Sequence, residues 1–340
     1  MCIRDRIPVY VGSIVLWYWQ HANISGPDAI YHAMNENDLK YADSTPPVAR
    51  YERSAERTSV TTSGPLIPVA GRDAAIAASP LSPGGKSLAT ALLRTSRPRI
   101  FPGGGLGIEY GALLKTAARP DLLASHIAEV AAHLSADRVD ILFVPGMSGY
   151  PIGAMYSQAS GIPALLLKKQ PWPPSDDTGY APGSFVIPSY TGSGDTLISA
   201  DTAAAADILA GLVDRQVAEQ IDAPSVEINL RIAGADEIID KAIMATAITE
   251  TAPIFCRSVI EDLLLARRDQ IGERAVAVGI SVSTWVTPLL KGYNGAAETL
   301  QARCGITPFA GLTITSLHID PPAIGIAGIG VVACDDEVMK

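Results

Sequence analysis

Apolar residues in the middle of the chain follow the repeats of regular secondary structure. Over 121–134 they fall on one face of a helix. The stretch 139–144 is a short, mostly apolar run that ends in Pro145-Gly146, as buried parallel strands do. A helix rich in small residues is expected over 150–160, and a second buried strand over 163–167. Strand, glycine turn, helix and strand in this order predict a βαβ unit.

Similar patterns extend over the rest of the chain. Strands are also expected over 7–19, 184–187, 226–232, 275–282, 311–317 and 323–333, and helices over 201–220, 235–249, 256–269 and 294–303. This alternation predicts an α/β fold, a doubly wound and mostly parallel sheet flanked by helices. Dense glycine and proline over 64–107, including Ser82-Pro83-Gly84-Gly85, predict loops around short elements. We therefore expect an irregular N-terminal region over 7–107 and an α/β domain over 108–340.

Residues 1–6 (MCIRDR) match the translation of a transposon end that is used to fragment DNA for sequencing. We interpret 1–6 as adapter sequence and expect the natural start to lie upstream. The apolar run over 7–19 contains Gly12 and is too short to span a bilayer, so a buried strand is expected there.

Composition excludes several classes of function. The formal net charge of −9 disfavours general affinity for the nucleic-acid backbone, but it allows a local basic pocket for a phosphorylated small molecule. Hydrophobic residues make up 48% of the chain, which is normal for a packed globule. The four cysteines, Cys2, Cys256, Cys304 and Cys334, form no C-x-x-C pair. We therefore expect no zinc site and no disulfide framework, and a reducing cytoplasm fits this usage.

The segment 139–154 (VDILFVPGMSGYPIGA) carries the clearest chemical signal. A buried strand delivers a tight turn to the carboxyl edge of the sheet, where Gly146 and Gly149 allow the backbone to approach a ligand closely. The helix that follows points free N–H groups at the same place, which favours an anion. Lys168-Lys169, the one adjacent lysine pair, leaves the next strand at that edge and would add positive charge.

This arrangement resembles the type I phosphoribosyltransferases of the adenine kind. In that family a strand ends in a Gly-x-x-Ser/Arg-Gly turn that opens a helix, and the next strand ends in a basic pair followed by a hood loop. The resemblance covers 139–190 and implies roles for three groups of residues. It places Gly146, Met147, Ser148 and Gly149 at the pyrophosphate turn, Lys168 and Lys169 at the basic pair, and 170–183 with Trp172 in the hood.

The family's most specific motif is missing. It is a buried strand that ends in two acidic residues and is followed by Thr-Gly-Gly-Thr, in which the acids hold the ribose hydroxyls and the glycines wrap the 5′-phosphate. Two segments with hydroxyl groups are candidates for the phosphate role. They are Asp201-Thr202, after a short apolar run, and Ser283-Thr284, in turns expected after the strand over 275–282. Neither carries the acidic pair.

Asp236 and Glu237 are adjacent acids, but they fall in a predicted helix. Neighbouring side chains on a helix point apart, which speaks against shared catalysis. We interpret these two residues as a solvated helix start.

The resemblance implies transfer of ribose 5-phosphate from phosphoribosyl pyrophosphate (PRPP) to a nucleobase, in nucleobase salvage or modification. It also implies Mg²⁺ on the pyrophosphate, with Lys168 or Lys169 neutralising the leaving group. Phe185 and Trp172 are the candidates for stacking on a purine. The expected partners are these small molecules and a second subunit in a homodimer, with no nucleic acid and no membrane.

Two alternatives stay open. The first is a non-catalytic relative that senses a nucleotide, which the missing acidic pair favours. The second is an unrelated sugar-phosphate isomerase domain that uses the same glycine turn. Such an isomerase needs a well-placed base, and His318 and Glu109 are the candidates.

Overall fold

The computed structural model describes residues 7–11, 14–18, 49–50, 64–100, 106–114, 119–172, 181–188 and 194–335. The chain divides into two compact units, Met1–Thr45 and Pro46–Lys340. The first contains an antiparallel hairpin of β1 (Ile7–Val11) and β2 (Ile14–Tyr18), so the single strand expected over 7–19 is wrong. The adapter interpretation concerns residues 1–6, which lie outside the described ranges.

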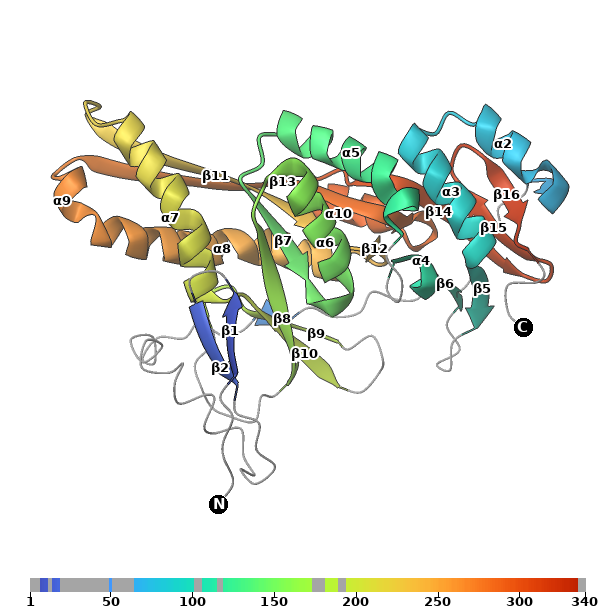
Figure 1. The fold of residues 1–340 in the computed structure, drawn as a ribbon, viewed down its shortest axis with the longest axis horizontal. Helices are drawn as coiled ribbons and strands as arrows, with labels where there is room; N and C mark the ends of the chain where they lie inside the picture. The colour runs from blue at the N-terminus through green and yellow to red at the C-terminus, as the bar shows by residue number, and fades with distance from the viewer. Residues whose placement is uncertain are drawn as a thin grey trace, which may run out of the picture. The chain divides into compact units, whose positions relative to one another are not determined.

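The second unit is built around one mixed sheet whose central strands are parallel (Figure 1). Its parallel centre consists, in order, of β8 (Ala164–Trp172), β7 (Ile141–Pro145), β11 (Ser225–Ala235), β13 (Ala275–Lys291) and β14 (Phe309–Ile319). Beyond β8 follow β10 (Asp195–Ser199), β9 (Phe185–Pro188) and β3 (Ala49–Arg50). Beyond β14 follow β15 (Pro322–Ile326), β16 (Gly330–Ala333) and β4 (Leu66–Ile67), and β12 (Ile238–Ile239) pairs with β13. The predicted α/β class with a mostly parallel sheet is confirmed.

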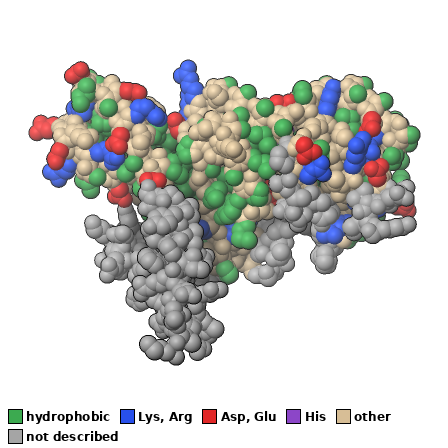
Figure 2. Space-filling view, in the orientation of Figure 1, with side chains coloured by type: hydrophobic (Ala, Val, Ile, Leu, Met, Phe, Trp, Pro, Cys, Tyr) green, Lys and Arg blue, Asp and Glu red, His purple; other side chains and the backbone are tan. Residues whose placement is uncertain are grey.

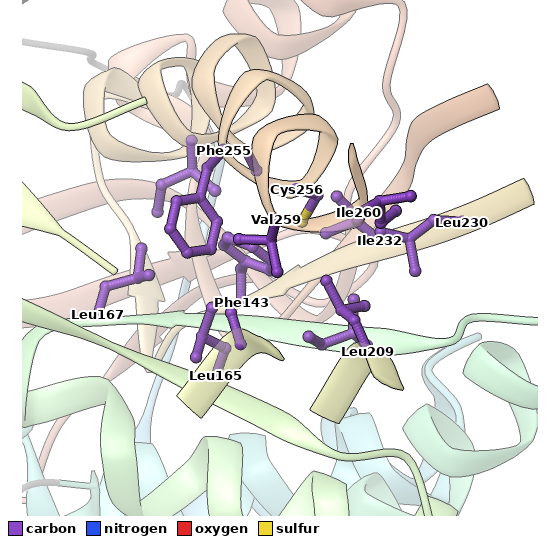
Figure 3. Close-up of a cluster of buried hydrophobic side chains, with 14 of the residues drawn as sticks. Phe143, Leu165, Leu167, Leu209, Leu230, Ile232, Phe255, Cys256, Val259 and Ile260 are labelled. Atoms are coloured by element: carbon purple, nitrogen blue, oxygen red, sulfur yellow. The ribbon is translucent and has the colours of Figure 1, made fainter. Parts of the chain in front are cut away.

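Helices cover both faces of this sheet. One face carries α7 (Thr202–Glu219), α8 (Ile243–Ala266) and α10 (Ala296–Cys304), and the other carries α3 (Pro83–Thr95), α5 (Pro120–Ala136) and α6 (Gly146–Ser160). Successive residues of β7 show the division, because Phe143 belongs to the core of the first face, and Leu142 and Val144 to that of the second. In Figure 3, Phe143 and Leu165 lie beneath Phe255 of α8.

Within the described residues, the remaining elements are short. They are two 3₁₀ helices, η2 (Val69–Gly71) and η3 (Gly292–Asn294), the helices α2 (Arg72–Ala78), α4 (Gly111–Leu114) and α9 (Arg268–Ile271), and the antiparallel hairpin of β5 (Arg97–Ile100) and β6 (Leu106–Glu109). In the described part of the chain, α8 is long and apolar enough to cross a membrane, but 56% of its most apolar stretch is buried inside the protein. It is therefore a core helix of this unit.

The predicted βαβ unit is confirmed as β7, α6 and β8, with the two strands parallel. In contrast, Ser82-Pro83-Gly84-Gly85, predicted as a loop, opens α3. Ser82 Oγ caps the helix by accepting a hydrogen bond from Gly85 N at 3.0 Å. A Cβ on Gly84 would lie 2.6 Å from the Cα of His126 in α5, so this glycine allows the two helices to pack closely. The segment is glycine-rich because of helix packing, not because of a turn.

The two helices predicted over 235–249 and 256–269 are also corrected. They form the one long helix α8, which begins at Ile243 and continues through Pro253. Ala252 and Phe255 on either side of the proline are buried, and this packing holds the helix together across the residue that would break it in isolation. Because the helix starts at 243, residues 235–242 have a different structure.

Candidate functional site

The glycine turn lies at the start of α6, at the carboxyl end of β7. Gly146 has a φ of 60°, a left-handed conformation that favours glycine. A Cβ on this residue would clash with Cε and Nζ of Lys169, and a Cβ on Gly149 would lie 2.9 Å from Asp236 Oδ1. The turn therefore brings a lysine and a carboxylate from two other strands to one place. The predicted turn residues, including exposed Met147 and half-buried Ser148, form the first turn of the helix.

The acids Asp236 and Glu237 directly follow β11. Parallel pairing of Ile232 with Ile141 and of Gly234 with Phe143 puts Asp236 level with the end of β7. The Asp236 backbone N–H donates to Val286 O at 3.2 Å, and the Glu237 N–H donates to Asp236 Oδ1 at 2.9 Å. The carboxyl ends of two neighbouring parallel strands thus present a glycine turn and an acidic pair at the same edge.

Asp236 and Glu237 lie in an environment that disfavours the ionised form of Asp236. Asp236 is partly buried, and Glu237 is only 4% exposed and accepts a hydrogen bond from Tyr110 Oη at 3.4 Å. Burial raises the pKa of Asp236 well above its ordinary value, the adjacent Glu237 raises it further, and Lys169 opposes the shift. A cation or hydroxyl groups placed here would relieve this cost, as expected for a ligand site.

The interpretation of Asp236 and Glu237 as a solvated helix start is wrong. Buried Ile228, Leu230 and Ile232 alternate along β11 and continue the strand to Ala235. The sequence did contain this signal, because an alternating strand followed at once by two acids matches the first half of the missing family motif. The helix predicted over 235–249 begins eight residues before the observed start of α8 at Ile243, and it therefore includes the two acids.

Lys168 and Lys169, the predicted basic pair, lie on opposite faces of β8, because successive strand residues alternate between the two faces. Lys168 Nζ binds Asp201 Oδ2 at 2.7 Å, and Asp201 Oδ1 also caps α7 by accepting from Ala204 N at 3.0 Å. Burial raises the pKa of Asp201, but the hydrogen bonds from Lys168 and Ala204 outweigh it and lower the pKa overall. Only Lys169 reaches the glycine turn. Asp201 and Thr202 therefore belong to the start of α7, with Lys168.

Ser283 and Thr284 were expected in hydroxyl-rich turns, and this local prediction is wrong. Both lie inside β13, which runs on to Lys291. Thr284 is buried and shares a hydrogen bond of 3.0 Å with His133 Nε2, while Ser283 Oγ lies 3.5 Å from Ile232 O. Their hydroxyl groups contact His133 and the backbone of β11, and they do not join the glycine turn.

Phe185 and His318, two further candidates, do not join the turn either. Phe185 is 2% exposed and belongs to the hydrophobic core, so its ring has no free face for a purine. His318 shares a hydrogen bond of 3.0 Å with Ser316 Oγ. The side chains of Trp172 and Glu109, and hood residues 173–180, lie outside what the structure describes.

The loop after the acidic pair, 238–242, contains no glycine. Its Asp240 binds Lys291 Nζ at 2.9 Å and accepts a second hydrogen bond from Asn294. Lys291 is 4% exposed, so this ion pair is largely removed from water. The loop is therefore closed by side chains of β13 and η3 that bind its Asp240, where the resembling family has a phosphate-wrapping loop.

On the face shown in Figure 2, Lys and Arg side chains are interspersed with Asp and Glu. Among the described residues, the positive charge at the glycine turn comes from Lys169, which lies beside the free N–H groups of α6. The N–H and ammonium donors suit a compact anion, and the neighbouring carboxylates suit a group with several hydroxyls.

No protein-family model matches the sequence. A search of curated proteins finds no match either. Among solved structures, the chain is similar to the APRTase of Giardia lamblia complexed with 9-deazaadenine, with a TM-score of 0.41 and 13% identity, covering 67% of this chain and 97% of that chain. The adenine phosphoribosyltransferase of Saccharomyces cerevisiae gives a TM-score of 0.39 and 15% identity, covering 66% and 99%. The orotate phosphoribosyltransferase of Aeropyrum pernix gives 0.33 and 17%, covering 66% and 93%. At these TM-scores the likeness is coarse, and the activity has to be inferred from the side chains of the site.

Proposed function

We propose that this site binds PRPP and transfers its ribose 5-phosphate to a nitrogen of a nucleobase. One observation carries the proposal: Asp236 lies against Gly149 of the glycine turn, so that an acidic pair and an anion-binding turn share one edge of the sheet. The turn and Lys169 suit a pyrophosphate. Asp236 and Glu237 suit the two ribose hydroxyls, because carboxyl oxygens accept hydrogen bonds.

Mg²⁺ fits these residues. In the described part of the chain no three metal-ligating side chains gather, but Mg²⁺ needs only one or two carboxylates when a substrate phosphate completes its shell. Asp236 and Glu237 would hold the ion, and when bound it would neutralise charge on the pyrophosphate.

The transfer breaks the bond from the ribose C1′ to pyrophosphate and forms a bond from C1′ to the base nitrogen, which gives up its proton to water. The sugar passes through an oxocarbenium-like state, so positioning and charge stabilisation matter more than a protein nucleophile. Lys169 and the free N–H groups of α6 would stabilise the leaving pyrophosphate, while the acidic pair orients the ribose.

Calorimetric titration of the protein with PRPP and Mg²⁺ tests this proposal, because the adjacent lysines provide a matched pair of variants. Lys169→Ala should weaken binding by about tenfold or more, the loss expected for a hydrogen bond to a charged group. Lys168→Ala should leave the affinity unchanged, because Lys168 is engaged by Asp201 away from the turn. Absence of binding to the unaltered protein, or equal effects of the two variants, would contradict the proposal.

A second candidate is a protein that binds such a ligand without turnover. The closed loop at 238–242 favours it, since Asp240 and its partner Lys291 stand where a 5′-phosphate would need free donors. Pyrophosphate release in the presence of a panel of nucleobases separates the two functions. Binding with release supports the transferase, and binding without release for any base supports the sensor.

A further inference from the structure

β11 and β13 extend beyond the other strands of the sheet as a two-stranded arm (Figure 1). β7 pairs with β11 only over Ile232–Gly234, and β14 pairs with β13 only from Val286 onward. Within the described residues, the arm over 225–231 and 275–285 therefore has no strand on either outer edge. Exposed strand edges carry unpaired backbone groups and invite pairing unless they are covered.

The β11 edge of the arm is covered by side chains that replace a strand. Gln220, the C-cap of α7, accepts from Glu227 N at 2.8 Å and donates to Glu227 O at 2.9 Å. Gln216 does the same for Asn229, at 2.8 Å and 2.9 Å. These two amides satisfy all four backbone groups that Glu227 and Asn229 present on this edge.

The β13 edge of the arm is open. Backbone groups along a strand alternate between its two edges, and Arg257 reaches Val278 O at 3.0 Å from the outer side. By this alternation the N–H and C=O groups of Val276, Val278, Ile280 and Val282 point outward. Within the described residues, only the contact from Arg257 engages them.

The sequence of this edge also lacks the usual protection against pairing. From 275 to 287 there is no charged residue and no proline, and valine and isoleucine alternate with small residues. The protein thus covers one edge of the arm with two dedicated glutamines. It leaves the other edge open apart from the contact of Arg257, and the strand itself has no charged residue there. Such an asymmetry is expected if the open edge has a regular partner.

We propose that the β13 edge over 276–282 pairs antiparallel with the same edge of a second copy of the protein, joining two sheets across a twofold axis. With Gly279 on the axis, Val276 lies opposite Val282 and Val278 lies opposite Ile280. All four have outward backbone groups, so every such pair exchanges two hydrogen bonds. The strand has no charged residue over 276–282, and identical patches meet, as twofold symmetry requires. This inference stands independently of the proposed function.

The exposed side chains of Ala277 and Ser281 provide a test by charge. In the proposed register, Ala277 of each copy faces Ser281 of the other, in the closely spaced type of pair. The double variant Ala277→Lys/Ser281→Lys places like charges opposite each other at two symmetry-related positions. It should raise the dissociation constant of the dimer by about tenfold. The matched variant Ala277→Lys/Ser281→Glu places opposite charges there and should keep the dimer at least as tight.

Sedimentation equilibrium of the full chain and both variants measures these constants. A dimeric unaltered protein, weakened by the lysine pair and retained by the lysine–glutamate pair, supports the interface. A monomeric unaltered protein, or a dimer that responds equally to the two variants, overturns it. Circular dichroism confirms that the variants fold, which is expected because both side chains are exposed.

Discussion

Lys169 lies directly over Gly146, so close that a Cβ on the glycine would clash with Cε and Nζ of the lysine. The glycine also has a φ of 60°. Two independent constraints, a left-handed backbone and the absence of a side chain, therefore coincide at the first residue of α6. Together they place the ammonium group beside the free N–H groups of the helix.

Replacing Gly146 should affect both stability, through the left-handed backbone, and ligand binding, through the contact with Lys169. Gly146→Ala should cost about 1–2 kcal/mol of stability from the left-handed backbone and should also displace Lys169, weakening PRPP binding. Gly161→Ala is the matched control, because Gly161 ends the same helix with a φ of 73° and a Cβ there would meet no atom within 4 Å. Urea denaturation should show similar losses for both variants, and calorimetry should show weaker binding for Gly146→Ala alone. Equal affinities in the two variants would contradict a role for this contact.

Asp236 should lower the stability of the free protein at neutral pH. Burial and the adjacent Glu237 raise its pKa, so the unfolded chain releases the proton from about pH 3.8 upward while the folded protein retains it. Each pH unit between the two pKa values then costs the folded state about 1.4 kcal/mol. Asp236→Asn should therefore be more stable than the unaltered protein at pH 7 and equal to it near pH 3.5, as measured by denaturation over that range. A variant that is less stable at pH 7 would show that the carboxylate is structural.

Substitutions of Lys291 and Asp240, which form a buried ion pair, should have strongly non-additive effects on stability. Lys291→Met leaves Asp240 without its cation in a site where Lys291 is 4% exposed, and should cost about 3–5 kcal/mol. Adding Asp240→Asn should recover much of this loss. Lys168→Met is the surface control, because the Lys168 and Asp201 side chains are 50% and 27% exposed, and it should cost about 1 kcal/mol or less. Additive effects of the Lys291 and Asp240 changes in a double-mutant cycle would refute the coupling.

The elements that sequence could predict are those with strong local periodicity. The glycine turn of 146–149 and the strands on either side of α6 could be found because a short apolar run that ends in Pro-Gly is typical of a buried parallel strand entering a turn. The position of Lys169 at the turn could be predicted too, since the ends of parallel strands meet at one edge.

What sequence missed depends on contacts between distant segments. Asp236 and Glu237 were assigned to a helix because a strand of small residues and the start of a helix look alike locally. The engagement of Lys168 by Asp201 requires the pairing of β8 with β10. Ser283 and Thr284 look like turn residues, but they lie within a strand because the pairing of β13 with β11 and the contact with His133 of α5 complete their surroundings.

Acid should destabilise the protein partly through His126. This side chain is fully buried, its Nε2 shares a hydrogen bond of 2.8 Å with Tyr156 Oη, and its Nδ1 has no hydrogen-bond partner among the described residues. Burial lowers its pKa from 6.5 to about 4. Below pH 6.5 the imidazole of the unfolded chain therefore binds a proton, whereas that of the folded protein stays neutral until about pH 4. The free energy of unfolding consequently falls as the pH drops toward 4, by roughly 3 kcal/mol in total.

His126→Gln should flatten this dependence between pH 6.5 and 4, as measured by urea denaturation at a series of pH values. The amide keeps a group that can bond Tyr156 but does not titrate there. Tyr156→Phe is the control, since it removes the partner and leaves the imidazole buried; it should lower stability at every pH and preserve the slope. If His126→Gln retained the full slope, the acid sensitivity would have to arise from the carboxylates instead, because burial of a neutral histidine would then contribute nothing measurable to it.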